Sequence, residues 1–402
     1  MTWRTLSSAP HRLFFLSGAT QAVLSVSWWA CDLSARYAGI FPKMDWLIPS
    51  VWIHAFLMIY GFFPFFIFGF LMTAAPNWVN GKKVERAHYV PAFLLMSIGI
   101  ALFYLAILAV KTAIAISVIV YLSGWLAGGL SLLKIVVVSR AQNKVHAYIV
   151  VGNVFMGWVG GILYLLWLFT GNPVLLHGSL TMGIWLFLLP IFLSVSHRMI
   201  PFFSSAVLPG YEPRRPYGPL FILLGGMAAH AALEMLNEVG YLWMADLPMA
   251  IVAFHLSWLW EIRRSFDVRL LAMLHIAFSW LGISMTLYAV QSLAHFASTE
   301  SVLGMAPLHA LTIGYFSSMV IAMVTRVTLG HSGGALKADN ITWIIFIVFQ
   351  STAFFRIIGD APFRDASYFY ILAAIVWLGC FGTWNLKHVA IYWKPRSDGK
   401  PG

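Results

Sequence analysis

The chain has 402 residues, of which 60% are apolar and only 10% are charged. A soluble domain of this length would carry about 25% charged residues, so the composition excludes an ordinary soluble protein. The net charge of +11 does not indicate nucleic-acid binding, because most of the Lys and Arg residues fall into the loops of one predicted membrane face.

Twelve apolar segments follow one another along the chain, and each is long enough to cross about 30 Å of hydrocarbon. Asp246 and Pro248 lie near the start of the eighth segment, which makes it the least regular. The segments predict one all-α polytopic transmembrane domain over residues 1–402. Its spans are predicted at about residues 12–31, 47–75, 89–109, 113–138, 147–169, 177–195, 219–237, 241–260, 268–292, 305–329, 341–359 and 367–391.

The distribution of basic residues predicts the orientation. With twelve spans both termini lie on one face, and that face holds most of the 25 Lys and Arg residues. The opposite face holds only Arg36, Lys43, Lys111, Arg356 and Arg364. Because Lys and Arg concentrate in cytoplasmic loops, we expect both termini to be cytoplasmic.

The second, sixth and tenth spans share one pattern. Each has a histidine near its outer end, a glycine five to seven residues later and a polar break at its cytoplasmic end. The histidines are His54, His177 and His309, and four spans separate each from the next. A fixed interval of this kind indicates an internal repeat. The pattern therefore predicts a pseudo-threefold arrangement of four, four and four helices.

These histidines are candidate metal ligands. Ionisable side chains inside a membrane are costly and usually face the bundle interior, and imidazole is a preferred ligand of haem iron and copper. The 22 residues from His309 to His331 span about 33 Å, so the outer and inner histidines cannot share a metal. The alternative is that each is an interfacial or bundle-facing polar residue. The outer group is His54, His177 and His309, and the inner group is His197, His275 and His331.

Two further pairs of residues are candidates for metal binding, proton donation or anion binding. His230 and Glu234 lie one helical turn apart, which suits a metal site or a proton donor; alternatively, Glu234 reaches outer water with His230 as its partner. Arg198 and Arg326 lie at cytoplasmic helix ends, where guanidinium groups could bind haem propionates or anionic lipid head groups. Alternatively, the two arginines only anchor their helix ends at the cytoplasmic face, where basic residues concentrate.

Four motifs carry a resemblance to a known family. They are "HAFLMIYGF" running into "FLMTAAPNW", "HRMIPFF", "LHIAFSWL" and "HALTIGYFSSMVIAMVTRVTLGHSG". On these motifs the chain resembles the NnrS family, membrane proteins linked to nitric oxide metabolism and described as containing haem and copper. The family usually has His-Ala-His-Glu-Met on its second helix, whereas this chain has Phe56 and Leu57 in place of the second His and the Glu. In architecture the chain is distantly similar to the catalytic subunits of haem–copper oxidases and nitric oxide reductases.

The resemblance implies a bacterial inner-membrane protein with haem b and copper that binds or detoxifies nitric oxide. If the protein is an enzyme, the implied reaction is the reduction of nitric oxide to nitrous oxide, with a quinol or a cytochrome c as electron donor. We expect haem between His54 and His309, a second metal at His177 and Glu234 as the catalytic proton donor. The inner pair, His275 and His331, would hold any second centre.

The sequence leaves three alternative functions open. The protein could be a non-catalytic haem-based sensor of nitric oxide, a metal chaperone or a secondary transporter. Transporters usually show two halves of six helices, whereas the histidines here repeat every four. Few carboxylates lie inside the spans, so a relay of ionisable groups from the cytoplasm is not visible and we expect no proton pumping.

Overall fold

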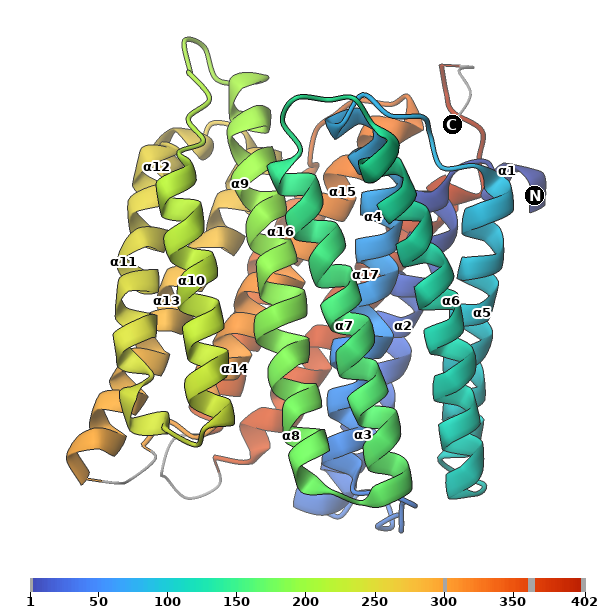
Figure 1. Cartoon of the computed structure of the whole chain (residues 1–402), viewed down its shortest axis with the longest axis vertical. Helices are drawn as coiled ribbons and strands as arrows, with labels where there is room; N and C mark the ends of the chain where they lie inside the picture. Colours follow the sequence, from blue (N-terminus) through green and yellow to red (C-terminus); the bar gives the residue numbers. More distant parts are fainter. Residues whose placement is uncertain (1–2, 299–301, 361–365, 399–402) are drawn as a thin grey trace.

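A computed structural model describes residues 3–298, 302–360 and 366–398, so Arg364 lies outside the described residues. The described residues form helices and no β-strand. Twelve helices are long and apolar enough to cross a membrane, which confirms the all-α polytopic prediction. The irregular eighth segment forms one of them, Val239–Leu259. Both termini lie at the same end of the bundle, here called the terminal face, and the other end is called the opposite face (Figure 1).

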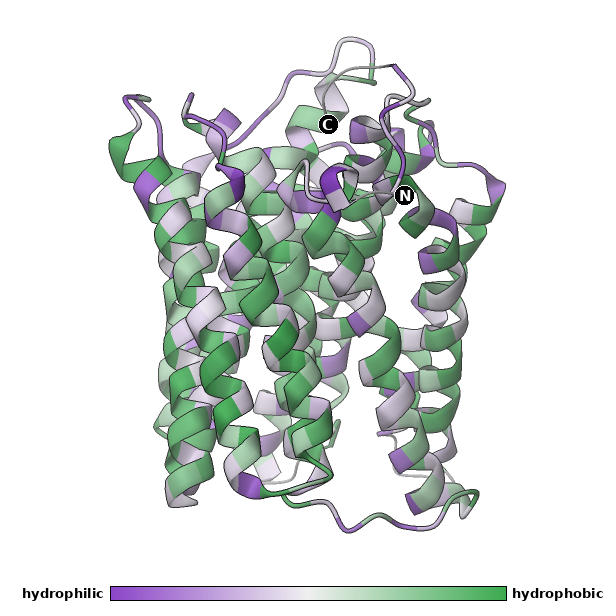
Figure 2. Ribbon diagram, turned by 90° about the vertical axis from the view of Figure 1, so that its right-hand side faces the viewer, coloured by the Kyte–Doolittle hydropathy of each residue, from purple (hydrophilic) through white to green (hydrophobic). Residues whose placement is uncertain are grey.

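Hydropathy varies along the helices as a membrane requires. Hydrophobic residues dominate the middle of the bundle, whereas hydrophilic residues gather at the helix ends and in the loops (Figure 2). Helices satisfy their own backbone hydrogen bonds, and for this reason they can cross hydrocarbon. The structure is therefore that of a membrane protein.

The three most buried spans are the three that carry the repeated histidines. Each consists of an α-helical segment, a π-helical segment and a second α-helical segment. The segments are α3 (Ser50–Phe56), η2 (Leu57–Phe62) and α4 (Phe63–Trp78); α8 (Pro173–Thr181), η3 (Met182–Leu188) and α9 (Leu189–Ser205); and α14 (Ala306–His309), η5 (Ala310–Ser317) and α15 (Ser318–Ser332).

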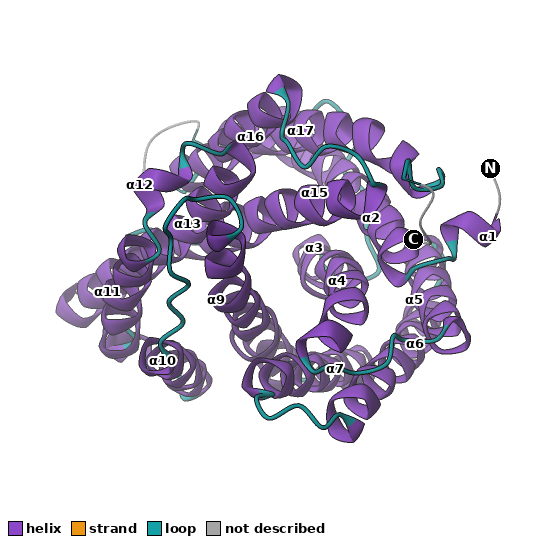
Figure 3. Ribbon diagram, turned by 90° about the horizontal axis from the view of Figure 1, so that it is seen from above, coloured by secondary structure: helices purple, strands orange, loops and turns teal. Residues whose placement is uncertain are grey.

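The other spans surround these central helices (Figure 3). Short helices α1 (Trp3–Leu6) and α12 (Ile262–Ser265) lie outside the spans. The surrounding elements are α2 (Pro10–Leu33) with the π-helical η1 (Ser34–Ala38), α5 (Arg86–Ala106), α6 (Lys111–Val138), α7 (Val145–Thr170), α10 (Tyr217–Met235), the 3-10 helix η4 (Val239–Tyr241) with α11 (Trp243–Leu259), α13 (Arg269–Ser298), α16 (Asn340–Ile358) and α17 (Tyr368–Tyr392).

Helix packing repeats at the predicted interval of four. In each group of four spans the first packs on the second and the third packs on the fourth. The fourth span then packs on the first span of the next group: α6 on α7, α11 on α13 and α17 on α2. The last of these contacts closes the ring. The first and last spans of the sequence therefore lie side by side.

The glycine of the repeat lies in the π-helical segment of each central span. These glycines are Gly61, Gly183 and Gly314. A Cβ atom at Gly314 would stand 2.5 Å from Trp280, and one at Gly183 would stand 2.6 Å from Ile59. Since real carbon atoms do not approach so closely, a larger residue would push the helices apart. The repeated glycine therefore permits close helix packing.

A π-helical turn leaves backbone carbonyl groups without their usual partners, and here hydroxyl groups supply them. The Tyr121 hydroxyl donates to the carbonyl of Tyr60 within η2. The Tyr60 hydroxyl in turn donates to the carbonyl of Ser179, at 2.6 Å, just before η3. In η5 the Ser317 hydroxyl donates to the Thr312 carbonyl at 2.7 Å. These hydrogen bonds stabilise the irregular helices inside the apolar core.

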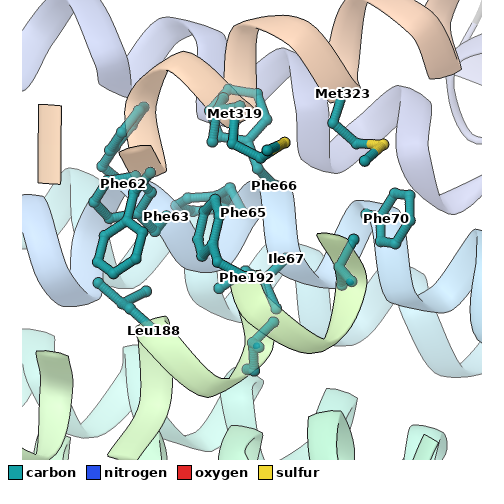
Figure 4. Packing of buried hydrophobic residues seen from close by; sticks show 14 of the residues in the cluster. Phe62, Phe63, Phe65, Phe66, Ile67, Phe70, Leu188, Phe192, Met319 and Met323 are labelled. Atoms are coloured by element: carbon teal, nitrogen blue, oxygen red, sulfur yellow. The ribbon is translucent and has the colours of Figure 1, made fainter. Parts of the chain in front are cut away.

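Three phenylalanine rings meet where the central spans converge. Phe63 lies 5.7 Å from Phe192 and 5.8 Å from Phe316 between ring centroids, and Phe192 lies 4.7 Å from Phe316. Figure 4 shows Phe63 and Phe192 from neighbouring helices in this packing. A void of about 50 Å³ next to Phe192 is lined only by Phe, Ile, Leu, Val and Met side chains. The centre of the bundle is therefore apolar.

Candidate functional site

His54 lies on α3, near the opposite face of the bundle. Its ring stacks on the ring of Trp29 from α2, with centroids 4.2 Å apart and planes 11° apart. Its Nδ1 atom is buried and has no hydrogen-bond partner among the described residues. A buried ring nitrogen without a donor or acceptor is unusual, because burial of an unsatisfied polar group costs free energy. His54 is therefore a candidate for binding a ligand.

His309 is the last residue of α14, also near the opposite face. Its Nδ1 atom lies 2.9 Å from the carbonyl oxygen of Met305, one turn earlier. Because a carbonyl can only accept, Nδ1 carries the proton and Nε2 of the neutral ring keeps its lone pair. Histidines that bind metals are usually held in this way, by a hydrogen bond from the nitrogen that does not bind.

The structure brings His54 and His309 into electrostatic range of each other. The positive charge of Arg356 lies in electrostatic range of both imidazoles, and that of Arg36 lies in range of His54. Each arginine is paired with a carboxylate one helical turn away: Arg36 with Asp32 and Arg356 with Asp360, both at 2.6 Å. The two histidines and the two guanidinium groups form the outer site.

The two residues that stand where the resemblance implies a second His and a Glu lie in the core. Phe56 and Leu57 are fully buried. The Phe56 ring packs on Phe103 and Tyr164, with centroids 4.7 and 4.6 Å away. At this position the chain therefore has aromatic packing in place of ionisable groups.

His177 does not join the outer site through any contact that the structure gives. Its side chain is exposed, and its Nε2 atom lies 3.2 Å from the backbone carbonyl oxygen of Glu234 on α10. The sequence suggested three inward-facing histidines at matching depth. The structure differs because His177 lies against the neighbouring span of its own group of four.

His230 is paired with Asp246 and not with Glu234, which corrects the sequence interpretation. The His230 Nδ1 atom lies 2.6 Å from Oδ1 of Asp246 on α11, and both side chains are almost fully buried. The His230 ring also stacks on Trp185 of η3, with centroids 3.4 Å apart. One Glu234 carboxylate oxygen is buried without a partner in the described structure. The predicted His230–Glu234 ligand pair is therefore not formed, because a carboxylate from the next span reaches the imidazole.

The inner histidines lie in separate contacts. His275 on α13 is 3.5 Å from the Ser204 hydroxyl, whereas the ring of His331 on α15 is 4.6 Å from that of His11 on α2. The structure thus shows no shared site for His275 and His331. A third contact joins His197 Nδ1 to Nε2 of His146, at 2.9 Å.

His146 immediately precedes the predicted span 147–169, and in the structure it lies within α7. His197 Nε2 donates to the Pro216 carbonyl at 3.0 Å, so His197 Nδ1 accepts from His146 Nε2. The Nδ1 atom of His146 is then left as a buried acceptor, with no donor among the described residues.

Arg198 and Arg326 line a cavity of about 580 Å³ at the terminal face, together with Arg215 from a loop. The 17 residues from His309 to Arg326 span about 25 Å along the helix. Arg326 therefore cannot contact a cofactor bound at His309. Within the described ranges, no group of three or more His, Cys, Asp or Glu side chains lies close enough to hold a metal ion.

Residues 5–396 match the profile of a protein family described as NnrS protein. The chain belongs to the NnrS family. The match covers almost the whole chain, and NnrS membership is consistent with a membrane protein related to nitric oxide. No curated protein matches the sequence.

Sequence reasoning missed several partners in this NnrS chain. Trp29, Arg36 and Arg356 at the outer site carry no local signal, because they reach it from other spans. A signal was available for His11. His11 and His146 both lie near the start of a span, and four spans separate them, so the interval that found His54 and His177 also applies to this pair.

Proposed function

We propose that the protein binds haem b between His54 and His309 and uses it to bind nitric oxide. The observation that carries the proposal is that these imidazoles lie near the opposite-face ends of two central helices, within electrostatic range of each other. Each has a ring nitrogen with no hydrogen-bond partner among the described residues: Nδ1 in His54 and Nε2 in His309. Haem held there would supply an iron to which nitric oxide can bind in exchange for one of the two imidazoles. His54 and His309 would hold the haem iron, since imidazole nitrogen is a common protein ligand of haem and each ring offers one nitrogen that is not hydrogen-bonded.

The basic residues of the outer site support the same proposal. Haem carries two propionate carboxylates, and arginine forks bind carboxylates in pairs of hydrogen bonds. Arg36 and Arg356 lie in range of the histidines, and their existing carboxylate partners, Asp32 and Asp360, hold them in place. We therefore assign the propionates to Arg36 and Arg356 in place of Arg198 and Arg326.

If the protein turns nitric oxide over, two molecules take up two electrons and two protons to give nitrous oxide and water. A quinol or a cytochrome c would supply the electrons. We propose that protons enter from the opposite face, where Glu234 and Asp246 both lie in electrostatic range of Tyr288. The packed rings of Phe63, Phe192 and Phe316 carry no ionisable group that could relay protons from the terminal face. Turnover in proteoliposomes should therefore not acidify the outside medium.

Copper stays a prediction. The described residues gather no set of three metal-binding side chains, and the Nε2 atom of His177 is engaged by the Glu234 carbonyl. We therefore assign no copper ligands and no step to copper. We further propose a bacterial inner membrane with the terminal face in the cytoplasm, because most Lys and Arg residues lie on that face.

The test is a visible spectrum of the purified protein with a pyridine haemochrome assay for haem b. We expect a low-spin, six-coordinate spectrum that is lost in His54→Ala and in His309→Ala. His331→Ala removes a histidine from the same helix about 33 Å away and should keep the spectrum. A wild-type protein without a Soret band overturns the proposal.

The same preparations separate the alternative functions. Haem that binds nitric oxide without forming nitrous oxide in the presence of a quinol would indicate a sensor. Packing in groups of four, and not in two halves of six, favours either haem function over a secondary transporter.

A further inference from the structure

The cavity at the terminal face lies among the ends of all three central spans. Its volume is about 580 Å³, enough for a ligand much larger than a water molecule. Three guanidinium groups line it: Arg198 from α9, Arg326 from α15 and Arg215 from the loop before α10. The rest of the wall is largely apolar and includes Phe70, Trp78, Phe202, Phe203, Val327 and Leu336.

Among the described residues, none of the three guanidinium groups has a carboxylate partner. The ion pairs of the described residues include neither Arg198, Arg215 nor Arg326, and no hydrogen bond from these side chains is present there. The Nε atoms of Arg215 and Arg326 are buried without a partner. Arg326 is only 5% exposed, so almost its whole side chain is removed from solvent.

Such an arrangement is unfavourable unless an anion completes it. A buried charge without a counter-ion is costly, because its desolvation is not compensated. The Arg326 guanidinium lies 3.9 Å from the Phe203 ring centroid and that of Arg198 lies 5.1 Å from Trp78. Contacts of this kind attract a guanidinium group, but they leave its N–H groups without acceptors.

We propose that the cavity binds the phosphate group of an organic phosphate. Arginine forks recognise phosphate oxygens with paired hydrogen bonds, and three of them converge here. The apolar wall suits a hydrocarbon body, and Phe202, which is 51% exposed, places part of that wall at the surface. Two sources share this chemistry: the head group of an anionic phospholipid and a soluble organic phosphate.

The experiment uses the full-length protein, delipidated in detergent. Phosphatidylglycerol, phosphatidylcholine and inorganic phosphate are titrated separately, and bound ligand is read by native mass spectrometry. The variants are Arg326→Gln and Arg215→Gln. The matched control is Arg140→Gln, which removes an exposed positive charge from the same face outside the cavity.

We expect the wild type and Arg140→Gln to bind phosphatidylglycerol equally, and the two cavity variants to bind it at least about tenfold more weakly. Without lipid, Arg326→Gln should melt no lower than the wild type, because it removes an uncompensated buried charge. Displacement of the lipid by millimolar inorganic phosphate would assign the site to soluble phosphates and still support the proposal.

Two results would overturn it. The first is equal phosphatidylglycerol binding by all four proteins, or binding by none of them. The second is loss of haem from Arg326→Gln or Arg215→Gln, which would make haem propionates the anions in the cavity. The haem spectrum of the histidine variants is a separate measurement, so failure here and failure of the proposed function are distinguishable.

Discussion

The ring of His54 stacks on that of Trp29 with 4.2 Å between centroids and 11° between planes. The indole thus fixes the plane in which the imidazole can present a ring nitrogen. The guanidinium of Arg36 lies 4.7 Å from the same indole and also pairs with Asp32. Trp29 is therefore a positioning residue for the outer site.

Removing that indole should loosen His54 without removing a ligand. We expect Trp29→Ala to weaken haem affinity about fivefold and so lower occupancy at limiting haem, since an aromatic contact contributes about 1 kcal/mol beyond its buried area. Trp29→Phe should restore most of the occupancy. Haem per protein, with the low-spin spectrum as a second readout, checks this. Trp258→Ala, at a residue that is 73% exposed, is the control. Unchanged occupancy in Trp29→Ala would contradict a positioning role.

The buried pair of His230 and Asp246 should be a stability determinant. Asp246→Ala leaves the imidazole without its partner and should cost about 3 kcal/mol, because a buried polar group then stays unsatisfied. Asp246→Asn keeps an oxygen that accepts from Nδ1 and should cost less. Thermal unfolding in detergent measures both variants, with the exposed Asp267→Asn as control. A melting temperature of Asp246→Ala equal to that of the wild type would show that the pair contributes nothing.

Gly314 and Gly152 give a matched test of the packing at the central helices. A Cβ at Gly314 would meet Trp280 at 2.5 Å, whereas a Cβ at Gly152 meets nothing within 4 Å. Gly314→Ala should lose about 1–3 kcal/mol, since overpacking forces neighbouring side chains or helices to move. Gly152→Ala should be neutral or slightly stabilising, because alanine favours the helix. Equal melting temperatures of the two variants would argue against close contact at η5.

Asp339 links α16 to α17, and its ionisation should make the stability of the fold depend slightly on pH. It caps α16 through the Thr342 amide at 2.9 Å and pairs with Lys387, which lowers its pKa to about 2. Because this pKa is lower than in the unfolded chain, the ionised form stabilises the fold above about pH 4. That contribution is lost as the pH falls towards 2.

The Asp339 side chain is 58% exposed, so the pair contributes less than about 1 kcal/mol. Asp339→Asn keeps the cap and removes the charge. Its deficit in melting temperature at pH 7 should shrink at pH 3, and 1 M salt should shrink it as well. A deficit that grows on acidification would exclude the ion pair as its cause.

The sequence determined the spans and their grouping in fours. Hydrocarbon thickness fixes the length of a span, and the histidines mark every fourth one, so both features can be read locally. It also located His54 and His309 at similar depth, because depth follows from the position within a span. The family motifs likewise lie on continuous stretches of the chain.

Only the tertiary structure decided which side chains meet. Several spans are apolar on nearly every side, so their sequences do not indicate how each helix is rotated about its own axis. That rotation pairs His230 with Asp246 in place of Glu234, sets His331 against His11 and gathers Arg198, Arg215 and Arg326 in one cavity. The π-helical segments depend on the same contacts, since their stability requires hydroxyl groups such as that of Tyr121 from a different span.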